Sequence, residues 1–198
     1  MAHISSIGAG MFSDLSISYA TYNFPTSNPS TLDQAGFDAL FATEIEVTEA
    51  TPTDTDFIRI ENVREFPSMG TPPNIVNVPV YGQATSQQVQ GQADAPSIEV
   101  TLNFIGTDWD DTDILGNRML ATGDQFVFRF TLLNTEPTGS SDTKWASSAA
   151  GIGSVQNTYY YWIGKMEALQ VNPQLTDANT ATLTISVQSD FYGAYTEN

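Results

Sequence analysis

The stretch Ser97-Ile-Glu-Val-Thr-Leu-Asn-Phe104 decides the fold class of this chain. Its residues alternate strictly, with apolar side chains at Ile98, Val100, Leu102 and Phe104 and polar ones between them. Because the side chains of a β-strand point alternately to opposite faces, this pattern predicts a strand with one buried and one solvated face. A solvated face on each strand favours antiparallel pairing.

The same alternation returns on both sides of this stretch. It predicts five further strands, at residues 58–63, 75–81, 126–132, 159–171 and 180–189. The glutamine-rich residues 83–92 predict the tip of an extended hairpin. One helix is expected over residues 108–123, where acidic side chains suit the first turn and a glycine ends the apolar spacing. The predicted fold is therefore mainly β, an antiparallel β-sandwich or half-barrel with one flanking α-helix.

Charge and turn residues divide the chain into two parts. Residues 1–56 hold eight acidic residues, no basic one and many turn formers, so we interpret them as an acidic N-terminal arm with partial order, including a short helix near 31–42. Residues 57–198 form the predicted β domain. Within it, residues 134–157 are rich in serine, glycine and threonine and predict a long surface loop.

The composition argues against most enzymes. The chain has no cysteine and a single histidine, His3, so thiolate nucleophiles, Cys zinc sites and serine-histidine triads are not expected. Its 23 acidic and 6 basic residues give a net charge of −17, which repels nucleic-acid phosphates and anionic lipids. No secretory leader or membrane-spanning run is recognisable in the sequence. We expect no catalytic residue, no metal ligand, no cofactor and no membrane partner.

Two local clusters invite a binding site, and each has a simpler interpretation. Asp108-Trp-Asp-Asp-Thr-Asp113 fails as an EF-hand, because Asp113 and Met119 stand where the loop needs Gly and Glu. The cluster therefore predicts a helix cap, with a Ca²⁺ site as the alternative. Tyr159-Tyr-Tyr-Trp162 could stack on a sugar, but in a strand its rings alternate between faces, which favours core and rim positions. No spacing picks out a carboxylate pair for glycoside hydrolysis.

Residues 56–191 carry a series of features in a fixed order. The early strand 58–63 precedes a Pro/Gly segment at 67–73 and the glutamine-rich hairpin ending at 91–97. Strand 98–104 then leads into the acidic-capped helix with Leu115 and Met119. The strand 126–133 and a late hairpin, 161–169 with 182–187, complete the series. In this order of elements the chain resembles the major tail tube protein of long-tailed bacteriophages.

The resemblance implies a structural protein of the virion tail, assembled in the host cytoplasm, and not an enzyme. It implies six copies per ring, with long hairpins pairing between neighbours into a continuous inter-subunit β-barrel. Stacked rings would form a hollow conduit through which DNA passes without specific binding during genome ejection. The partners it implies are further copies of the chain, a tape-measure protein, a tail terminator and a distal tail protein.

Five polar residues are candidates for the lumen face of such a tube. They lie opposite the apolar side of the predicted strands: Glu61, Glu99, Thr101, Asn103 and Glu167. Two alternatives stay open at this point. One is another β-rich virion protein, such as a tail terminator, a connector or a head decoration protein. The other is a Ca²⁺-assisted carbohydrate-binding module built on the acidic and aromatic clusters.

Overall fold

The computed structural model describes residues 13–18, 57–70, 75–79, 81–82, 85, 87–90, 97–110, 115–116, 124–132 and 158–196. Within these ranges the chain is mainly β, as predicted, with very little helix. The strands are β1 (Asp14–Ser18), β2 (Phe57–Arg59), β3 (Val63–Glu65), β4 (Ile75–Val78), β5 (Gln87–Gln90), β6 (Ser97–Asn103), β7 (Phe126–Leu132), β8 (Thr158–Asn172), β9 (Thr180–Val187) and β10 (Tyr192–Thr196).

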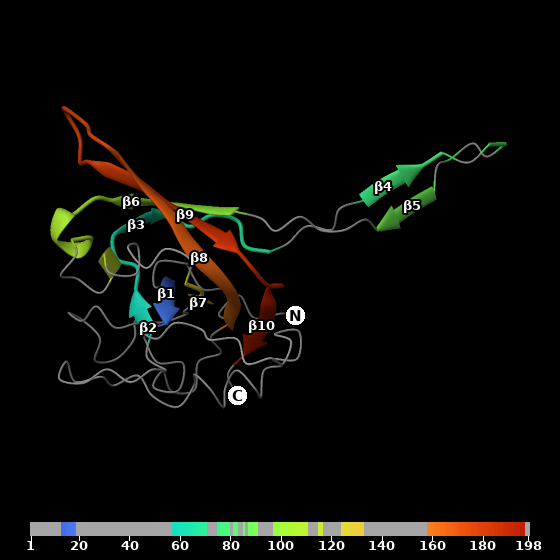
Figure 1. The fold of residues 1–198 in the computed structure, drawn as a ribbon, viewed down its shortest axis with the longest axis horizontal. Helices are drawn as coiled ribbons and strands as arrows, with labels where there is room; N and C mark the ends of the chain where they lie inside the picture. The colour runs from blue at the N-terminus through green and yellow to red at the C-terminus, as the bar shows by residue number, and fades with distance from the viewer. Residues whose placement is uncertain are drawn as a thin grey trace, which may run out of the picture.

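Eight strands form one antiparallel sheet in the order β2-β1-β7-β8-β9-β6-β3, with β10 also paired to β8 (Figure 1). The long strand β8 connects its two halves. Residues 158–164 of β8 pair with β7, and residues 164–172 pair with β9. The antiparallel pairing predicted from alternation is confirmed for every pair of described strands.

A three-residue link joins the two ends of this sheet. The sequence pattern predicted one strand over residues 58–63, and this prediction is wrong, because β2 pairs with β1 and β3 pairs with β6. The break lies at Asn62, whose φ of 59° is left-handed. The Ile60 amide donates to the Leu15 carbonyl (2.8 Å), and the Asn103 amide to the Asn62 carbonyl (2.9 Å). Since four chain steps span at most about 14 Å, the sheet must curl to bring its end strands together.

One hydrophobic core is shared by both halves of the sheet. Its fully buried side chains come from β1, β2, β6, β7, β8 and β9. At its centre Trp162 of β8 stacks on Phe128 of β7, with ring centroids 5.7 Å apart and planes 9° from parallel. The alternation predicted for β6 is confirmed, since its apolar residues are buried and its polar ones are exposed or half-buried.

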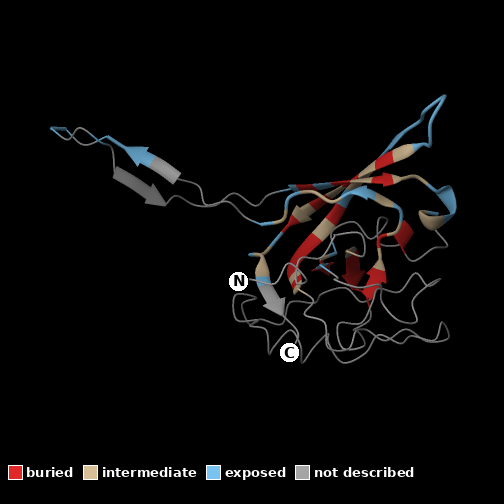
Figure 2. Cartoon of the chain, turned by 180° about the vertical axis from the view of Figure 1, so that it is seen from behind, coloured by how far each residue is buried: buried red, intermediate tan, exposed pale blue. Residues whose placement is uncertain are grey.

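Strand β7 departs from the predicted alternation, because the residues on both of its faces are buried. Figure 2 shows the buried residues gathered on the strands of the main sheet and the exposed residues at the turn between β8 and β9. Arg129 and Thr131 are each 2% exposed, although a polar residue between phenylalanines predicts a solvated side. The guanidinium of Arg129 lies 4.5 Å from the centre of the Phe57 ring, a cation–π contact that accommodates its charge in the interior. From the sequence alone, an arginine at this position is therefore predicted to lie on the surface, although the structure buries it.

Several elements differ from the prediction or fall outside the described residues. Strand β1 comes from the stretch that we assigned to the arm, and β10 lies beyond the last predicted strand; both were missed. At the start of the expected helix, residues 106–108 form a 3₁₀ turn and residues 109–110 a bend, so no α-helix begins at Asp108; residues 115–116 are helical, with Leu115 buried. Residues 111–114 and 117–123, the helix near 31–42 and the loop 134–157 lie outside the described residues.

Strands β4 and β5 form a hairpin of their own, paired from Ile75↔Gln90 to Val78↔Gln87. Figure 1 shows this hairpin extending away from the main sheet. Its turn includes residues 81–82, so the glutamines at 87–90 form the returning strand and not the tip that the sequence predicted. Strand β4 ends just before Pro79, which cannot donate a hydrogen bond to a strand ladder.

The left-handed backbone at Asn62 gives a first testable prediction. Asn62→Val should lower the free energy of unfolding by about 1–2 kcal/mol, because a β-branched side chain strains this conformation. Asn62→Gly is the matched control, since it also removes the side-chain hydrogen bond to Asp108 Oδ2 (3.3 Å) but tolerates the backbone. Urea unfolding followed by circular dichroism measures both. Equal stability of the two variants would contradict the prediction.

Candidate assembly surfaces

A continuous polar surface runs across strands β6, β9 and β8. The sheet register aligns its residues in rows, with Ser97, Glu99, Thr101 and Asn103 of β6 opposite Ser186, Thr184, Thr182 and Thr180 of β9. On the next strand, Lys165 pairs with Ser186 and Gln170 with Thr182. All these residues stand on the side away from the buried residues of β9, so the surface is rich in hydroxyl groups and has few charges.

Four of the five candidate lumen residues belong to this polar surface. Glu99, Thr101 and Asn103 are its β6 members. Glu167 lies at the irregularity of β8 between Met166 and Ala168, where its Oε1 accepts a hydrogen bond of 2.6 Å from Ser186 Oγ. Ser186 Oγ in turn accepts a hydrogen bond of 3.2 Å from Gln188 Nε2. The structure therefore brings these four residues onto one side of the sheet.

Glu61 lies apart from that arrangement of rows. It belongs to the link between β2 and β3, is half-buried and lines an open depression of about 390 Å³. The other lining residues are Ser13, Arg59, Ile60, Asn62, Val63 and Phe66. The break at Asn62 explains the difference, because Glu61 no longer sits at a regular strand position. When the alternation of a strand is extended past the point where the strand ends, the residues beyond that point are assigned to the wrong face of the sheet.

The aromatic run 159–162 contributes mainly to the interior. Tyr159, Tyr161 and Trp162 are buried, and Tyr160 is half-buried against the core. Tyr161 stacks on Tyr192 of β10 with ring centroids 4.9 Å apart. These rings are not available as a flat platform for a sugar, which is the outcome that the alternation of a strand predicted.

The acidic cluster is described as far as Asp110. Asp108 ends the 3₁₀ turn Gly106–Asp108, and residues 111–114, which precede the helical residues 115–116, lie outside the described residues, so the predicted acidic cap stays a prediction. The Asp108 carboxylate accepts hydrogen bonds from Asn62 Nδ2 (3.3 Å) and Thr107 Oγ1 (3.4 Å). Within the part of the chain that the structure describes, no three acidic or histidine residues gather as a metal site.

Several strand edges of the sheet have no partner among the described strands, including the outer edges of β2 and β10. In β8 the pairing with β7 stops at Gly164, so residues 165–172 pair on one side only, with β9. The outer edge of β3 forms the end of the sheet. The β4–β5 hairpin adds two further edges, because its strands pair only with each other. Such edges can accept a strand from another chain.

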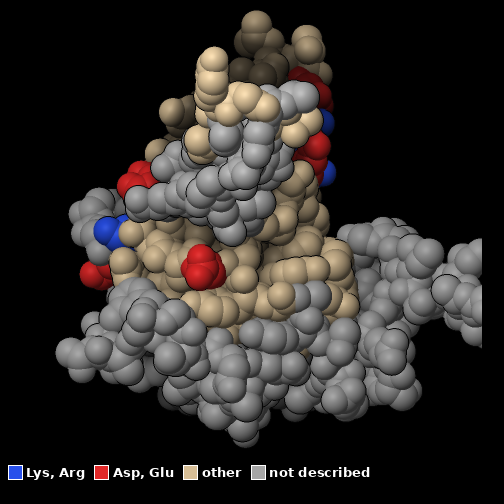
Figure 3. Space-filling view, turned by 90° about the vertical axis from the view of Figure 1, so that its right-hand side faces the viewer, with Lys and Arg blue, Asp and Glu red and all other residues tan. Residues whose placement is uncertain are grey.

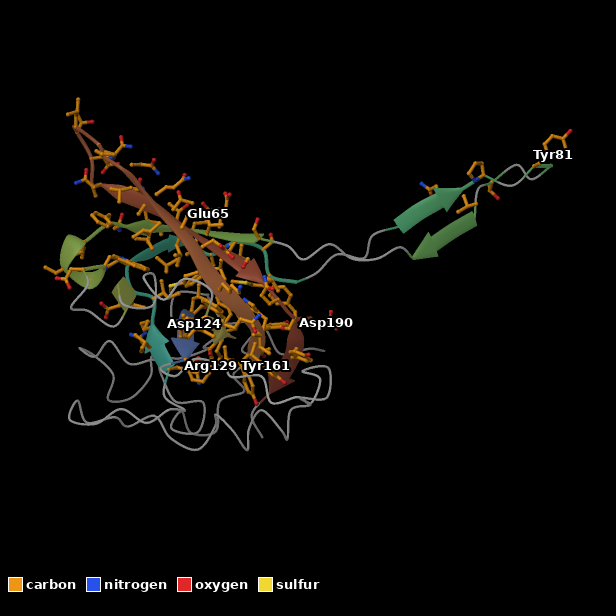
Figure 4. All side chains as sticks on the ribbon, viewed as in Figure 1. Glu65, Tyr81, Asp124, Arg129, Tyr161 and Asp190 are labelled. Carbon is orange, nitrogen blue, oxygen red and sulfur yellow. The ribbon has the colours of Figure 1, made fainter. Side chains whose placement is uncertain are left out.

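Charged groups are sparse on the side from which the hairpin projects. Figure 3 shows most of the described surface in that view without acidic or basic side chains; a few acidic and basic groups are visible, most of them near its edges. Figure 4 shows Tyr81 at the outer end of the hairpin, far from the labelled residues of the main sheet.

Among the described residues, no helix is long and apolar enough to cross a membrane. No protein-family model and no curated protein matches the chain.

Proposed function

We propose that this chain is a structural, non-catalytic subunit of a phage tail tube, whose hexameric rings stack into a hollow conduit for genome ejection. The observation that carries the proposal is the β4–β5 hairpin, which pairs with no other described strand and extends away from the sheet (Figure 1). A protein that works alone covers or shortens such edges. A long open hairpin is therefore better suited to an assembly of copies.

The finer architecture belongs to the same proposal. In this proposal the curled sheet forms a β-sandwich or half-barrel with one flanking helix. The hairpins of neighbouring copies pair to complete an inter-subunit β-barrel. Two observations support the curled shape: the three-residue link between the ends of the sheet and the single core shared by both halves. Ring closure pairs the open edges of all copies, which removes a source of aggregation.

The polar surface of β6, β9 and β8 is the proposed lumen lining, with Glu99, Thr101, Asn103 and Glu167 among its residues; the fifth candidate, Glu61, lies outside it in the link between β2 and β3. Hydroxyl groups dominate this surface, and its few charged residues are the carboxylates Glu99 and Glu167 and the basic Lys165. A negative wall repels phosphate groups, so DNA slides past without being bound. The chain's net charge of −17 acts in the same direction.

The proposal also names partners and a location. Copies of the chain contact one another within and between rings, a tape-measure protein occupies the tube during assembly, and a tail terminator and a distal tail protein end it. The subunit is assembled in the host cytoplasm and becomes part of the virion tail. No cofactor and no membrane take part in this function.

Electron microscopy of the purified, concentrated protein tests this function. We expect hollow rods with a regular axial repeat and six-fold symmetry in cross-section. The matched control replaces residues 72–93 by a short Gly-Ser linker. Because the hairpin pairs only with itself among the described strands, the sheet of this variant should melt at the wild-type temperature while rods are lost.

Other outcomes would redirect the assignment. Isolated rings or trimers would favour a tail terminator, a connector or a head decoration protein. Monomers that persist even with preformed tube ends as seeds would contradict self-assembly. A melting temperature that rises strongly with Ca²⁺ and falls with a chelator would favour the carbohydrate-binding module, since a ligand that binds the folded state stabilises it.

A further inference from the structure

We propose that the β4–β5 hairpin of one copy docks on the β8–β9 hairpin of the next copy, in a head-to-tail contact that places Tyr81 against Leu175. This inference rests on the proposed function only in requiring that the chain self-associates. It names the two elements that contact each other, and these cannot be deduced from the order of elements in the sequence.

Charge distribution is the first argument for this pair of elements. Residues 66–93, which include the whole β4–β5 hairpin, contain no charged side chain. Residues 168–189, which include the outer part of β8 and all of β9, contain one, Asp177. In a chain of net charge −17, copies repel one another over most of their surfaces. The two hairpins are therefore among the segments that can approach another copy at low electrostatic cost, as are the uncharged stretches 15–32 and 145–164.

Exposed apolar side chains mark the same two hairpins. Among the described residues, six large apolar side chains are exposed: Val78, Tyr81, Ile105, Leu132, Val171 and Leu175. Four of them lie on these two hairpins, and the two most exposed are Tyr81 (106%) and Leu175 (105%) at the turns. A contact between the turns would remove both from water, which is favourable in proportion to the apolar area that it covers.

The strand edges provide the backbone part of the contact. Residues 165–172 of β8 have no described strand on the side opposite β9, and β4 and β5 each have an open outer edge. A hairpin strand added to β8 would satisfy amide and carbonyl groups of both copies, as in other cases of strand addition. The β8–β9 turn is ordered to receive it, since the Asn179 carboxamide oxygen accepts a hydrogen bond from the Gln174 amide (2.9 Å).

The positions of the two hairpins allow a head-to-tail contact. In Figure 1 the β4–β5 hairpin extends to one side of the molecule and the β8–β9 turn projects at the other. Each copy can therefore offer one of these two different surfaces to each of two neighbours. Such a contact closes into a ring or continues as a filament.

Site-specific cross-linking tests the contact, because the chain has no cysteine of its own. Two single variants of the full-length protein, Tyr81→Cys and Leu175→Cys, are treated with a short bis-maleimide separately and as an equimolar mixture. The mixture should give at least about tenfold more cross-linked dimer than either variant alone, because docked thiols react at a high effective concentration. Melting temperatures equal to the wild type would confirm that both variants fold.

The matched control is a mixture of Ile105→Cys and Leu132→Cys, which places thiols at the two exposed apolar residues outside the hairpins. Dimer formation in the Tyr81/Leu175 mixture no greater than in this control overturns the docking, even if rods form in the microscope. Strong cross-linking without rods leaves the docking in place and overturns the tail tube. Equal yields in the mixture and in the single variants would indicate a symmetric contact and overturn the head-to-tail arrangement.

Discussion

Replacing Trp162 by alanine should lower the free energy of unfolding by about 3–5 kcal/mol, the range for a large aromatic side chain removed from a core. Trp162 is fully buried on β8, stacks on Phe128 and lies 4.9 Å from the Phe191 ring, measured between centroids. It thus joins β7, β8 and the segment before β10. Because both halves of the sheet share this core, the cavity cannot collapse by moving one strand.

Urea unfolding followed by far-ultraviolet circular dichroism measures this loss. Trp162→Phe is the informative comparison, since it keeps an aromatic ring and removes the indole NH, which finds no hydrogen-bond partner within the described part of the chain. It should cost less than half of the alanine effect. Leu175→Ala, at a fully exposed position, should stay within about 0.5 kcal/mol of the wild type. A wild-type midpoint for Trp162→Ala would contradict the assignment of the core.

Adding one methyl group at Gly164 should cost about 1–3 kcal/mol, although the change is small. Gly164 is the residue of β8 where pairing with β7 ends and pairing with β9 begins. A Cβ atom there would lie 2.6 Å from the Ser186 carbonyl oxygen and 3.3 Å from the Phe128 ring. The carbonyl belongs to the backbone of β9, so relief of the clash requires the sheet itself to move.

Gly106→Ala is the matched control for Gly164→Ala. At Gly106 the nearest contact of an added Cβ is a carbon of the Phe104 ring at 3.9 Å, an ordinary van der Waals distance. The control should change stability by no more than about 0.5 kcal/mol. Comparable losses in the two alanine variants, measured as shifts in the urea midpoint, would show that the close approach of β9 to β8 at Gly164 is not the cause.

The sequence pattern predicted the strands whose two faces differ in environment. In β6 and β9 every second residue is buried, and the alternation identified both strands nearly to their ends. Strand β7 is an exception to this alternation, because its second face is also buried. The polar residues Arg129 and Thr131 on that face give no indication of their burial in the sequence. Strand β1 was missed although Leu15 and Ile17 alternate with serines, because it has only five residues and lies in a stretch rich in turn formers.

The part of the candidate surface that lies on a single regular strand could be predicted from the sequence. Glu99, Thr101 and Asn103 share a face because they are two residues apart on one strand. Glu167 joins them only through the irregularity of β8 and its hydrogen bond to Ser186, which depend on tertiary contacts. Glu61 was assigned by the alternation of Ile58 and Ile60 with Arg59 and Glu61, but β2 ends at Arg59 and the chain turns at the left-handed Asn62.

The neighbours of β1 have a consequence for how the chain folds. This strand lies between β2 and β7, and Ser16 Oγ donates to the Arg129 carbonyl across a sequence separation of 113 residues. A two-stranded β1–β2 pair alone is at best marginally stable in water. During synthesis, Leu15 and Ile17 therefore stay without their main partner until the ribosome has produced β7. Such high contact order slows folding and keeps these apolar segments accessible to chaperones until β7 has been translated.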